Sequence, residues 1–149
     1  TVYAAARALE EYFEEGEEAK WARHTRAFEA IHRGLDGLGF RDVIRREDQA
    51  GLVVSALYPD DARWDFGKIH DYCYARGFTI YPGKIDSADT FRLCALGAID
   101  EKDIEDFFIV FKDALEHCQV SIPVHYEDRP IKCPEGGKKR RRTDDEERT

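Results

Sequence analysis

Arg92 is the side chain whose type and position best suit it to bind a substrate. It lies in the stretch TFRLCA (residues 90–95), where apolar residues alternate with others as they do in a strand with one buried face. The alternation places Arg92 on the face opposite the core, beside Cys94 and Leu96. A guanidinium fixed on a strand can donate two parallel hydrogen bonds to a carboxylate. A surface arginine paired with a nearby Asp or Glu is equally consistent with this spacing.

Other kinds of chemistry have weaker support. His70 and Cys73 share a helix face, and His117 precedes Cys118, but a closed zinc site needs four convergent ligands. We therefore expect no metal site. The sequence has no GxSxG motif for a nucleophilic serine, and the glycines after residue 33 do not form a GxGxxG motif.

The elements that must position Arg92 follow from hydrophobic periodicity. Apolar residues at steps of three and four predict a long helix over residues 1–38, with a bend at Gly16 inside an acidic run. The other predicted elements are strands over 40–44, 51–58, 78–81 and 90–96, and helices over 65–76 and from Asp100 onward. The strand over 51–58 is apolar on both faces, which favours an interior position.

Short strands joined by tight turns, with helices that must cover one face, predict an α/β fold. We expect a two-layer sandwich with a mainly antiparallel small sheet, preceded by the long linking helix. The expected division is a linking helix over 1–38, a small domain over 39–118 and an irregular, disordered tail over 119–149.

Composition limits the classes of function. At 149 residues the chain suits one domain, and its net charge of −8 disfavours nucleic-acid binding. The basic run at 138–142 is followed at once by acidic residues, which favours a solvated tail over an anion-binding patch. No apolar run could cross a membrane, and four cysteines without CxxC spacing favour a reducing, cytoplasmic setting. Because the chain begins at Thr1 and has no methionine, we expect it to be part of a longer polypeptide.

The chain resembles the small, C-terminal domain of class V, fold-type I aminotransferases, most of all the 2-aminoethylphosphonate–pyruvate aminotransferases. The resemblance spans about residues 1 to 115, including a linking helix that contains Ala22-Arg23-His24. The matching motifs are Tyr58-Pro59, Arg76-Gly77-Phe78, the YPGK sequence at 81–84, Asp89-Thr90-Phe91-Arg92 and Gly97. Cys94 departs from the RIGNIG-like pattern of the family and could reshape the pocket wall.

The resemblance implies a transferase that uses pyridoxal 5'-phosphate (PLP) and moves an amino group from 2-aminoethylphosphonate, or a similar amine, to pyruvate. It also implies that Arg92 anchors the acidic group of the substrate. The family binds PLP through a lysine of its large domain, and six lysines of this chain do not match that context: Lys20, Lys68, Lys84, Lys102, Lys112 and Lys132. We therefore expect no catalytic residue in this chain and no activity without a large domain or a homodimeric partner.

Two alternatives remain open. The chain could be a non-catalytic module or accessory subunit that binds a carboxylate or phosphonate through Arg92. It could instead belong to a transaminase of the alanine–glyoxylate or serine–pyruvate type within the same class.

Overall fold

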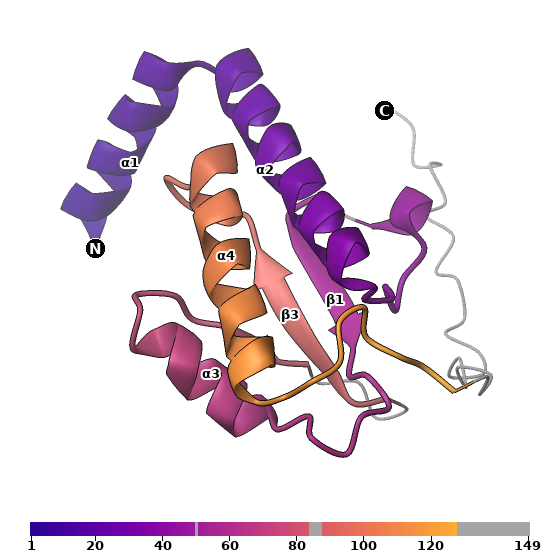
Figure 1. Cartoon of the computed structure of the whole chain (residues 1–149). Helices are drawn as coiled ribbons and strands as arrows, with labels where there is room; N and C mark the ends of the chain where they lie inside the picture. Colours follow the sequence, from indigo (N-terminus) through magenta and orange to yellow (C-terminus); the bar gives the residue numbers. More distant parts are fainter. Residues whose placement is uncertain (50, 84–87, 128–149) are drawn as a thin grey trace.

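The computed structural model of the chain describes residues 1–49, 51–83 and 88–127. The elements, in chain order, are α1 (Val2–Glu15), α2 (Glu17–Leu38), a 3-10 turn η1 (Arg46–Asp48), β1 (Val53–Leu57), α3 (Phe66–Tyr74), β2 (Tyr81–Pro82), β3 (Thr90–Cys94) and α4 (Glu101–His117). Figure 1 shows α2, α3 and α4 in front of the sheet, with α1 leaning away from α2. The predicted α/β fold with a small antiparallel sheet is confirmed.

The sheet has the order β1-β3-β2, and β3 is antiparallel to both neighbours. β1 is therefore at an edge, and the expectation that it is interior was wrong. A single bridge between Asp42 and Ala56 covers its outer side, held by bonds from Val43 N to Ser55 O and from Leu57 N to Arg41 O. The strand predicted over 40–44 is thus reduced to that bridge, because the chain turns away after residue 43 into η1.

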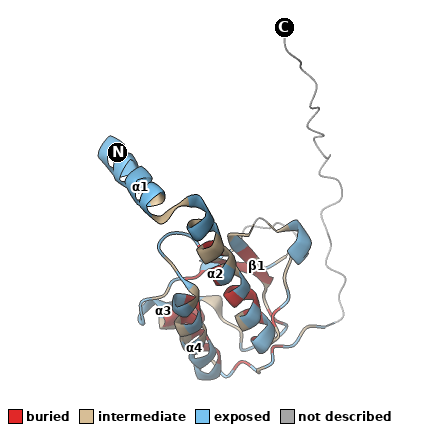
Figure 2. Cartoon of the chain, turned by 90° about the horizontal axis from the view of Figure 1, so that it is seen from above, coloured by how far each residue is buried: buried red, intermediate tan, exposed pale blue. Residues whose placement is uncertain are grey.

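The core lies between the helices and one face of β1 and β3 (Figure 2). From the sheet, Val54, Ala56, Phe91, Leu93 and Ala95 are buried, as their alternation predicts. The helices contribute a longer set of buried apolar side chains: Ala27, Ala30, Ile31, Leu35, Ile69, Cys73, Ile104, Phe107, Phe111, Ala114 and Leu115. The Phe-rich stripe of α4 is therefore part of the core.

α3 and α4 begin where the sequence predicts, because both have an aspartate that caps the first turn. Asp65 accepts a bond from Lys68 N, and Asp100 forms a reciprocal capping box with Asp103. α3 ends at Tyr74, two residues before the predicted end, and Gly77 follows with φ 89°. β2 comprises only Tyr81–Pro82, so the strand expected over 78–81 is shorter and shifted toward Pro82.

The bend predicted at Gly16 is confirmed. Gly16 has φ 83° and ψ 151°, outside the helical region, and it separates α1 from α2. None of the residues of α1 is buried, although Val2, Leu9 and Phe13 are large and apolar. Figure 2 shows α1 projecting from the body of the domain with exposed residues along its length.

The chain after α4 is irregular but packs onto the domain as far as residue 126. Val120 and Val124 are buried, and Val124 N donates to Leu38 O at 2.8 Å. Tyr126 donates its hydroxyl proton to Leu57 O at 2.9 Å, and burial raises the pKa of Tyr126 to about 12. Asp61 accepts bonds from Arg63 and from Ser121 N. The folded unit therefore includes residues 119–126, whereas the predictions for 128–149 concern residues outside the described part.

Gly39 supports this packing and provides a test of it. Its φ is 83°, and an added Cβ would lie 2.9 Å from Pro123 Cβ and 3.2 Å from Val124 N. Because left-handed backbone and a close contact both penalise a side chain, Gly39→Ala is expected to lower the free energy of unfolding by about 1–3 kcal/mol. Urea titration followed by circular dichroism measures this change.

The control for Gly39→Ala is Gly37→Ala, two residues earlier inside α2. An added Cβ at Gly37 meets nothing within 4 Å. Alanine is the better helix former there, so Gly37→Ala should stabilise the domain by roughly 0.5–1 kcal/mol. Changes of the same sign and size in both variants would contradict the packing of residues 123–124 against the end of α2.

Within residues 1–49, 51–83 and 88–127, no helix combines the length and the apolar character needed to cross a membrane.

Candidate substrate-binding site

Arg92 lies in the central strand of the sheet, on the face away from the helices. The register places it opposite Ser55 of β1 and opposite Tyr81 of β2. Arg92 is half-buried, whereas its neighbours Phe91 and Leu93 are buried in the core. The structure thus places the guanidinium on the face that the alternation in the sequence predicts.

The Nε atom of Arg92 is buried and has no hydrogen-bond partner among the described residues. Within that same part of the chain, the structure records no ion pair for Arg92. A buried donor without a partner costs about 1–3 kcal/mol, so native proteins seldom retain one without a reason.

A hollow of about 600 Å³ opens beside Arg92. It forms because β2 pairs with only Phe91 and Arg92, which leaves the edge of β3 after Arg92 uncovered on that side. Its lining includes Phe78 and Tyr81 before and within β2, Cys94 of β3, and Phe107 of α4. Asp103 of α4 also lines it, opposite in charge to Arg92. A largely apolar hollow with a few polar groups is typical of sites that bind small organic molecules.

Cys94 contributes packing to this site. Burial raises the pKa of the Cys94 thiol, and the charge of Arg92 opposes that rise. A thiol with a raised pKa carries little thiolate at neutral pH, so it is a poor nucleophile. Cys94 therefore forms part of the wall near Arg92.

The histidine and cysteine pairs noted in the sequence make packing contacts and hydrogen bonds within the domain. His70 contacts Asp71 and stacks on Tyr74 with ring centroids 5.8 Å apart, while Cys73 is fully buried. The ring of His117, at the end of α4, packs against Tyr72 at a tilt of 34°, with ring centroids 5.0 Å apart. In the described part of the chain, no three His, Cys, Asp or Glu side chains converge in a way that could hold a metal ion.

The described lysines do not fit a PLP-binding role. Lys68, Lys102 and Lys112 are exposed on helices and lie beside Asp65, Asp106 and Glu116 respectively. Lys20 lies over the ring of Tyr12, 5.3 Å from its centroid. A Schiff-base lysine needs an enclosed cavity with groups for the ring nitrogen and the phosphate. Lys68, Lys102 and Lys112 lie in no such place, and Lys20 lines an open hollow between α1 and α2 whose nearest charged groups are mostly carboxylates. Lys84 and Lys132 are outside the described residues.

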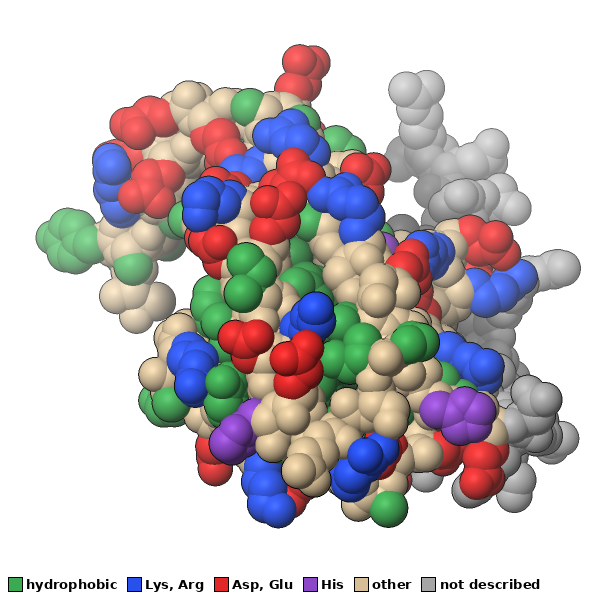
Figure 3. Space-filling model, in the orientation of Figure 1, with side chains coloured by type: hydrophobic (Ala, Val, Ile, Leu, Met, Phe, Trp, Pro, Cys, Tyr) green, Lys and Arg blue, Asp and Glu red, His purple; other side chains and the backbone are tan. Residues whose placement is uncertain are grey.

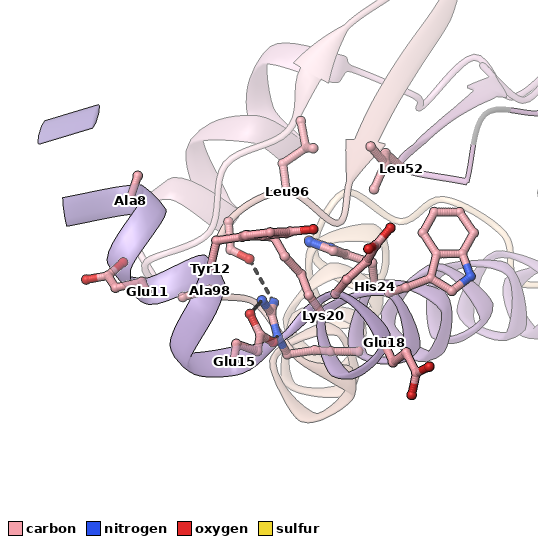
Figure 4. Close-up of a pocket in the computed structure, with 14 residues that line it drawn as sticks. Ala8, Glu11, Tyr12, Glu15, Glu18, Lys20, His24, Leu52, Leu96 and Ala98 are labelled. Atoms are coloured by element: carbon pink, nitrogen blue, oxygen red, sulfur yellow. Dashed lines mark hydrogen bonds and ion pairs between the residues drawn. The ribbon is translucent and has the colours of Figure 1, made fainter. Parts of the chain in front are cut away.

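A second hollow, of about 930 Å³, lies between α1, the start of α2 and the loop after β3 (Figure 4). Glu15 and Lys20 line it from the two helices, and Leu96 and Ala98 line it from the loop. Charged side chains of both signs cover the surface over α1 and the first half of α2 (Figure 3). The sequence pattern did not predict this hollow. The local feature that relates to it is Gly16, where the chain bends between two helices that both carry charged residues.

Curated proteins that match the chain in sequence are transaminases. The 2-aminoethylphosphonate–pyruvate transaminase 1 of Cupriavidus pinatubonensis is 33% identical over 123 residues, which are 81% of this chain and 32% of that protein. The 2-aminoethylphosphonate–pyruvate transaminase of Phocaeicola vulgatus is 38% identical over 103 residues, 68% of this chain and 28% of that protein. The chain is homologous to part of these transaminases. It spans about a third of the length of the curated relatives it matches, and no family model matches it.

Solved structures show that the fold is that of a part of an aminotransferase. The ureidoglycine–glyoxylate aminotransferase of Bacillus subtilis superposes with a TM-score of 0.66 at 19% identity, over 74% of this chain and 29% of that chain. The alanine–glyoxylate aminotransferase of Nostoc sp. gives a TM-score of 0.68 at 18% identity, over 76% and 30%. These structural neighbours are class V aminotransferases, as the sequence motifs predicted.

Proposed function

We propose that the chain supplies the substrate-anchoring part of a PLP-dependent transaminase. The reaction would move an amino group from 2-aminoethylphosphonate, or a related amine, to pyruvate. Arg92 would bind the phosphonate or carboxylate of the substrate. The homology to 2-aminoethylphosphonate–pyruvate transaminases supports the choice of substrates, and the site around Arg92 supports the role of this residue.

The observation that carries the proposal is that Arg92, whose buried Nε has no hydrogen-bond partner among the described residues, is one of the residues that line the hollow. Strands β1 and β2 hold the backbone of Arg92 on both sides, through Ser55 and Tyr81. The backbone at Arg92 therefore keeps its place before a ligand arrives, which reduces the entropy lost on binding. An acidic group could accept two of its donors side by side, whereas a neutral amide cannot supply two equivalent oxygens.

PLP would supply the electron sink that the reaction requires, but the residues described here do not fit the cofactor. We propose that the Schiff-base lysine comes from protein outside these residues. The region homologous to the remaining two-thirds of the relatives, or a second subunit, could provide it. On this proposal the chain orients the acidic end of the substrate, and the other part performs the proton transfers.

Isothermal titration calorimetry of the 149-residue chain with pyruvate and with pyruvamide tests the anchoring role. The two molecules have nearly the same shape, and only pyruvate carries a carboxylate. Pyruvate, and 2-aminoethylphosphonate in a separate titration, should bind with a dissociation constant on the order of 1 mM, which corresponds to about 4 kcal/mol. Pyruvamide should not bind. Equal affinity for pyruvate and pyruvamide would contradict anchoring through the acidic group.

A further inference from the structure

Arg23, near the start of α2, joins two segments that are distant in the sequence. Its Nε and one terminal nitrogen donate to the two carboxylate oxygens of Glu15 in α1, at 2.7 and 2.9 Å. Its other terminal nitrogen donates to Gly97 O at 2.9 Å and to Ile99 O at 3.0 Å. A guanidinium has five N–H donors, so these four bonds use nearly all of them.

The next residue of α2 extends the same contact. His24 is buried, and its Nδ1 lies 2.8 Å from Ala95 O, so that nitrogen must carry the proton and donate it. Side chains at two successive positions of α2 thus bind the carbonyl oxygens of Ala95, Gly97 and Ile99. These are alternate residues of the segment that leads from β3 to α4. Arg23 and His24 therefore hold this segment against α2 at three carbonyl groups.

The segment from Leu96 to Ile99 is a wall of both hollows. Leu96 and Ala98 line the hollow between α1 and α2 and also the hollow beside Arg92, and Ile99 lines the second of these. It begins two residues after the end of β3 and four residues after Arg92. A shift of this segment would therefore change the shape of the hollow beside Arg92.

The orientation of α1 depends on the same guanidinium. Gly16 separates the helices with a backbone conformation open to glycine, and α1 buries none of its residues. Two described interactions join α1 to α2 by side chains: the two bonds from Arg23 to Glu15, and Lys20 over the Tyr12 ring. The side chains of Arg23 and Glu15 are only 21% and 29% exposed, which protects their ion pair from screening by water. Figure 4 shows Glu15 directed toward this contact, between α1 and the loop that carries Ala98.

We propose that Arg23 is a positioning residue that holds both α1 and the Leu96–Ile99 segment, and that by fixing this segment it sets the shape of the Arg92 hollow. The effect on ligand binding rests on the proposed function of Arg92, whereas the effect on the two segments does not. Arginine is required because a lysine ammonium cannot present the planar fork that binds Glu15 and two carbonyl groups at once.

Three variants of the 149-residue chain separate the parts of this proposal in ¹H–¹⁵N NMR spectra. Arg23→Lys should shift the amide signals of residues 97–99 and lower the heteronuclear NOE along α1. Glu15→Ala should lower the NOE of α1 and leave the signals of 97–99 in place, because the bonds to Gly97 and Ile99 remain. Arg7→Ala is the control: it removes an arginine of α1 whose ion pairs are with Glu10, Glu11 and Glu14 of the same helix. It should change neither segment outside its own turn.

Pyruvate binding adds a readout that a merely structural role would leave unchanged. Arg23→Lys keeps the positive charge, and yet it should weaken pyruvate binding roughly fivefold or more, because the Leu96–Ile99 segment that lines the hollow loses its bonds to the guanidinium. Glu15→Ala and Arg7→Ala should stay within about twofold of the unaltered chain. An Arg23→Lys chain with unchanged signals at 97–99 and unchanged pyruvate affinity would overturn the proposal. If the unaltered chain fails to bind pyruvate, the proposed function fails, and the NMR signals alone decide the role of Arg23.

Discussion

Replacing Phe91 with alanine is expected to lower the free energy of unfolding by about 3–5 kcal/mol, the largest effect of any single change proposed for this domain. Phe91 is 0% exposed and lies in the central strand. Its ring packs against Phe40, Trp64 and Phe111 with centroids 5.3, 5.8 and 5.7 Å away. Truncation would leave a cavity where the sheet, α4 and the segment after α2 meet, and several aromatic rings would lose a neighbour.

Chemical denaturation gives this change directly, and Phe13→Ala is the control. Phe13 is 76% exposed on α1, so its truncation should change the free energy of unfolding by less than about 0.5 kcal/mol. Since a typical domain is stable by only about 5–15 kcal/mol, the loss expected for Phe91→Ala is a large fraction of the total stability. Similar losses for Phe91 and Phe13 would mean that the core does not lie beneath β3.

Replacing Arg92 with glutamine is expected to weaken the binding of pyruvate and of 2-aminoethylphosphonate by roughly tenfold or more. Hydrogen bonds to charged groups contribute about 1.5–3 kcal/mol each, and glutamine removes both the charge and the parallel donors. The affinity of Arg92→Lys should lie between those of the unaltered chain and of Arg92→Gln, because lysine keeps the charge and loses the planar fork. Titration calorimetry with the unaltered chain as reference measures all three affinities.

Arg76→Gln is the matched control for Arg92→Gln. Arg76 follows α3, where its guanidinium lies 3.5 Å from the centre of the Tyr72 ring and donates to Tyr72 O. The same loss of charge at Arg76 should leave pyruvate binding unchanged within about twofold, because Arg76 contacts Tyr72 and is not among the residues that line the hollow beside Arg92. Equal weakening in both variants would show that the acid senses the overall charge of the domain and not a site at Arg92.

Local sequence signals predicted much of this fold. The caps of α3 and α4 depend on residues three positions apart, so Asp65 and Asp100 are recognisable in the sequence. The break at Gly16 is also local, since a glycine inside an acidic helical stretch has few helix-stabilising contacts. The burial of Phe91 and Leu93 with Arg92 on the other face follows from the two-residue period of a strand.

The differences arise where pairing between distant segments decides the structure. β1 looks interior because both of its faces are apolar, but its place at the edge depends on how many strands pair, which no local pattern specifies. The residues around Asp42 form one bridge instead of a strand for the same reason. The packing of Val120 and Val124 was not predicted, because an irregular segment has no period to recognise.

The candidate site shows the same division. The type and face of Arg92 were predictable, whereas its unpartnered Nε and the hollow beside it depend on the shortness of β2. Arg23 was visible in the sequence only as part of a helix. Its bonds to Gly97 and Ile99 span 74 and 76 residues, so no spacing rule could have indicated them.

The central claim is that the guanidinium of Arg92 itself binds the acidic group. The most direct measurement follows the side-chain Nε–H signal of Arg92 by ¹H–¹⁵N NMR, assigned by its loss in Arg92→Lys, during titration with 2-aminoethylphosphonate and pyruvate. The claim predicts that the signal moves downfield with either acid, saturates at the calorimetric dissociation constant, and stays in place with pyruvamide. Binding of either acid with the Arg92 Nε–H signal unmoved would contradict it.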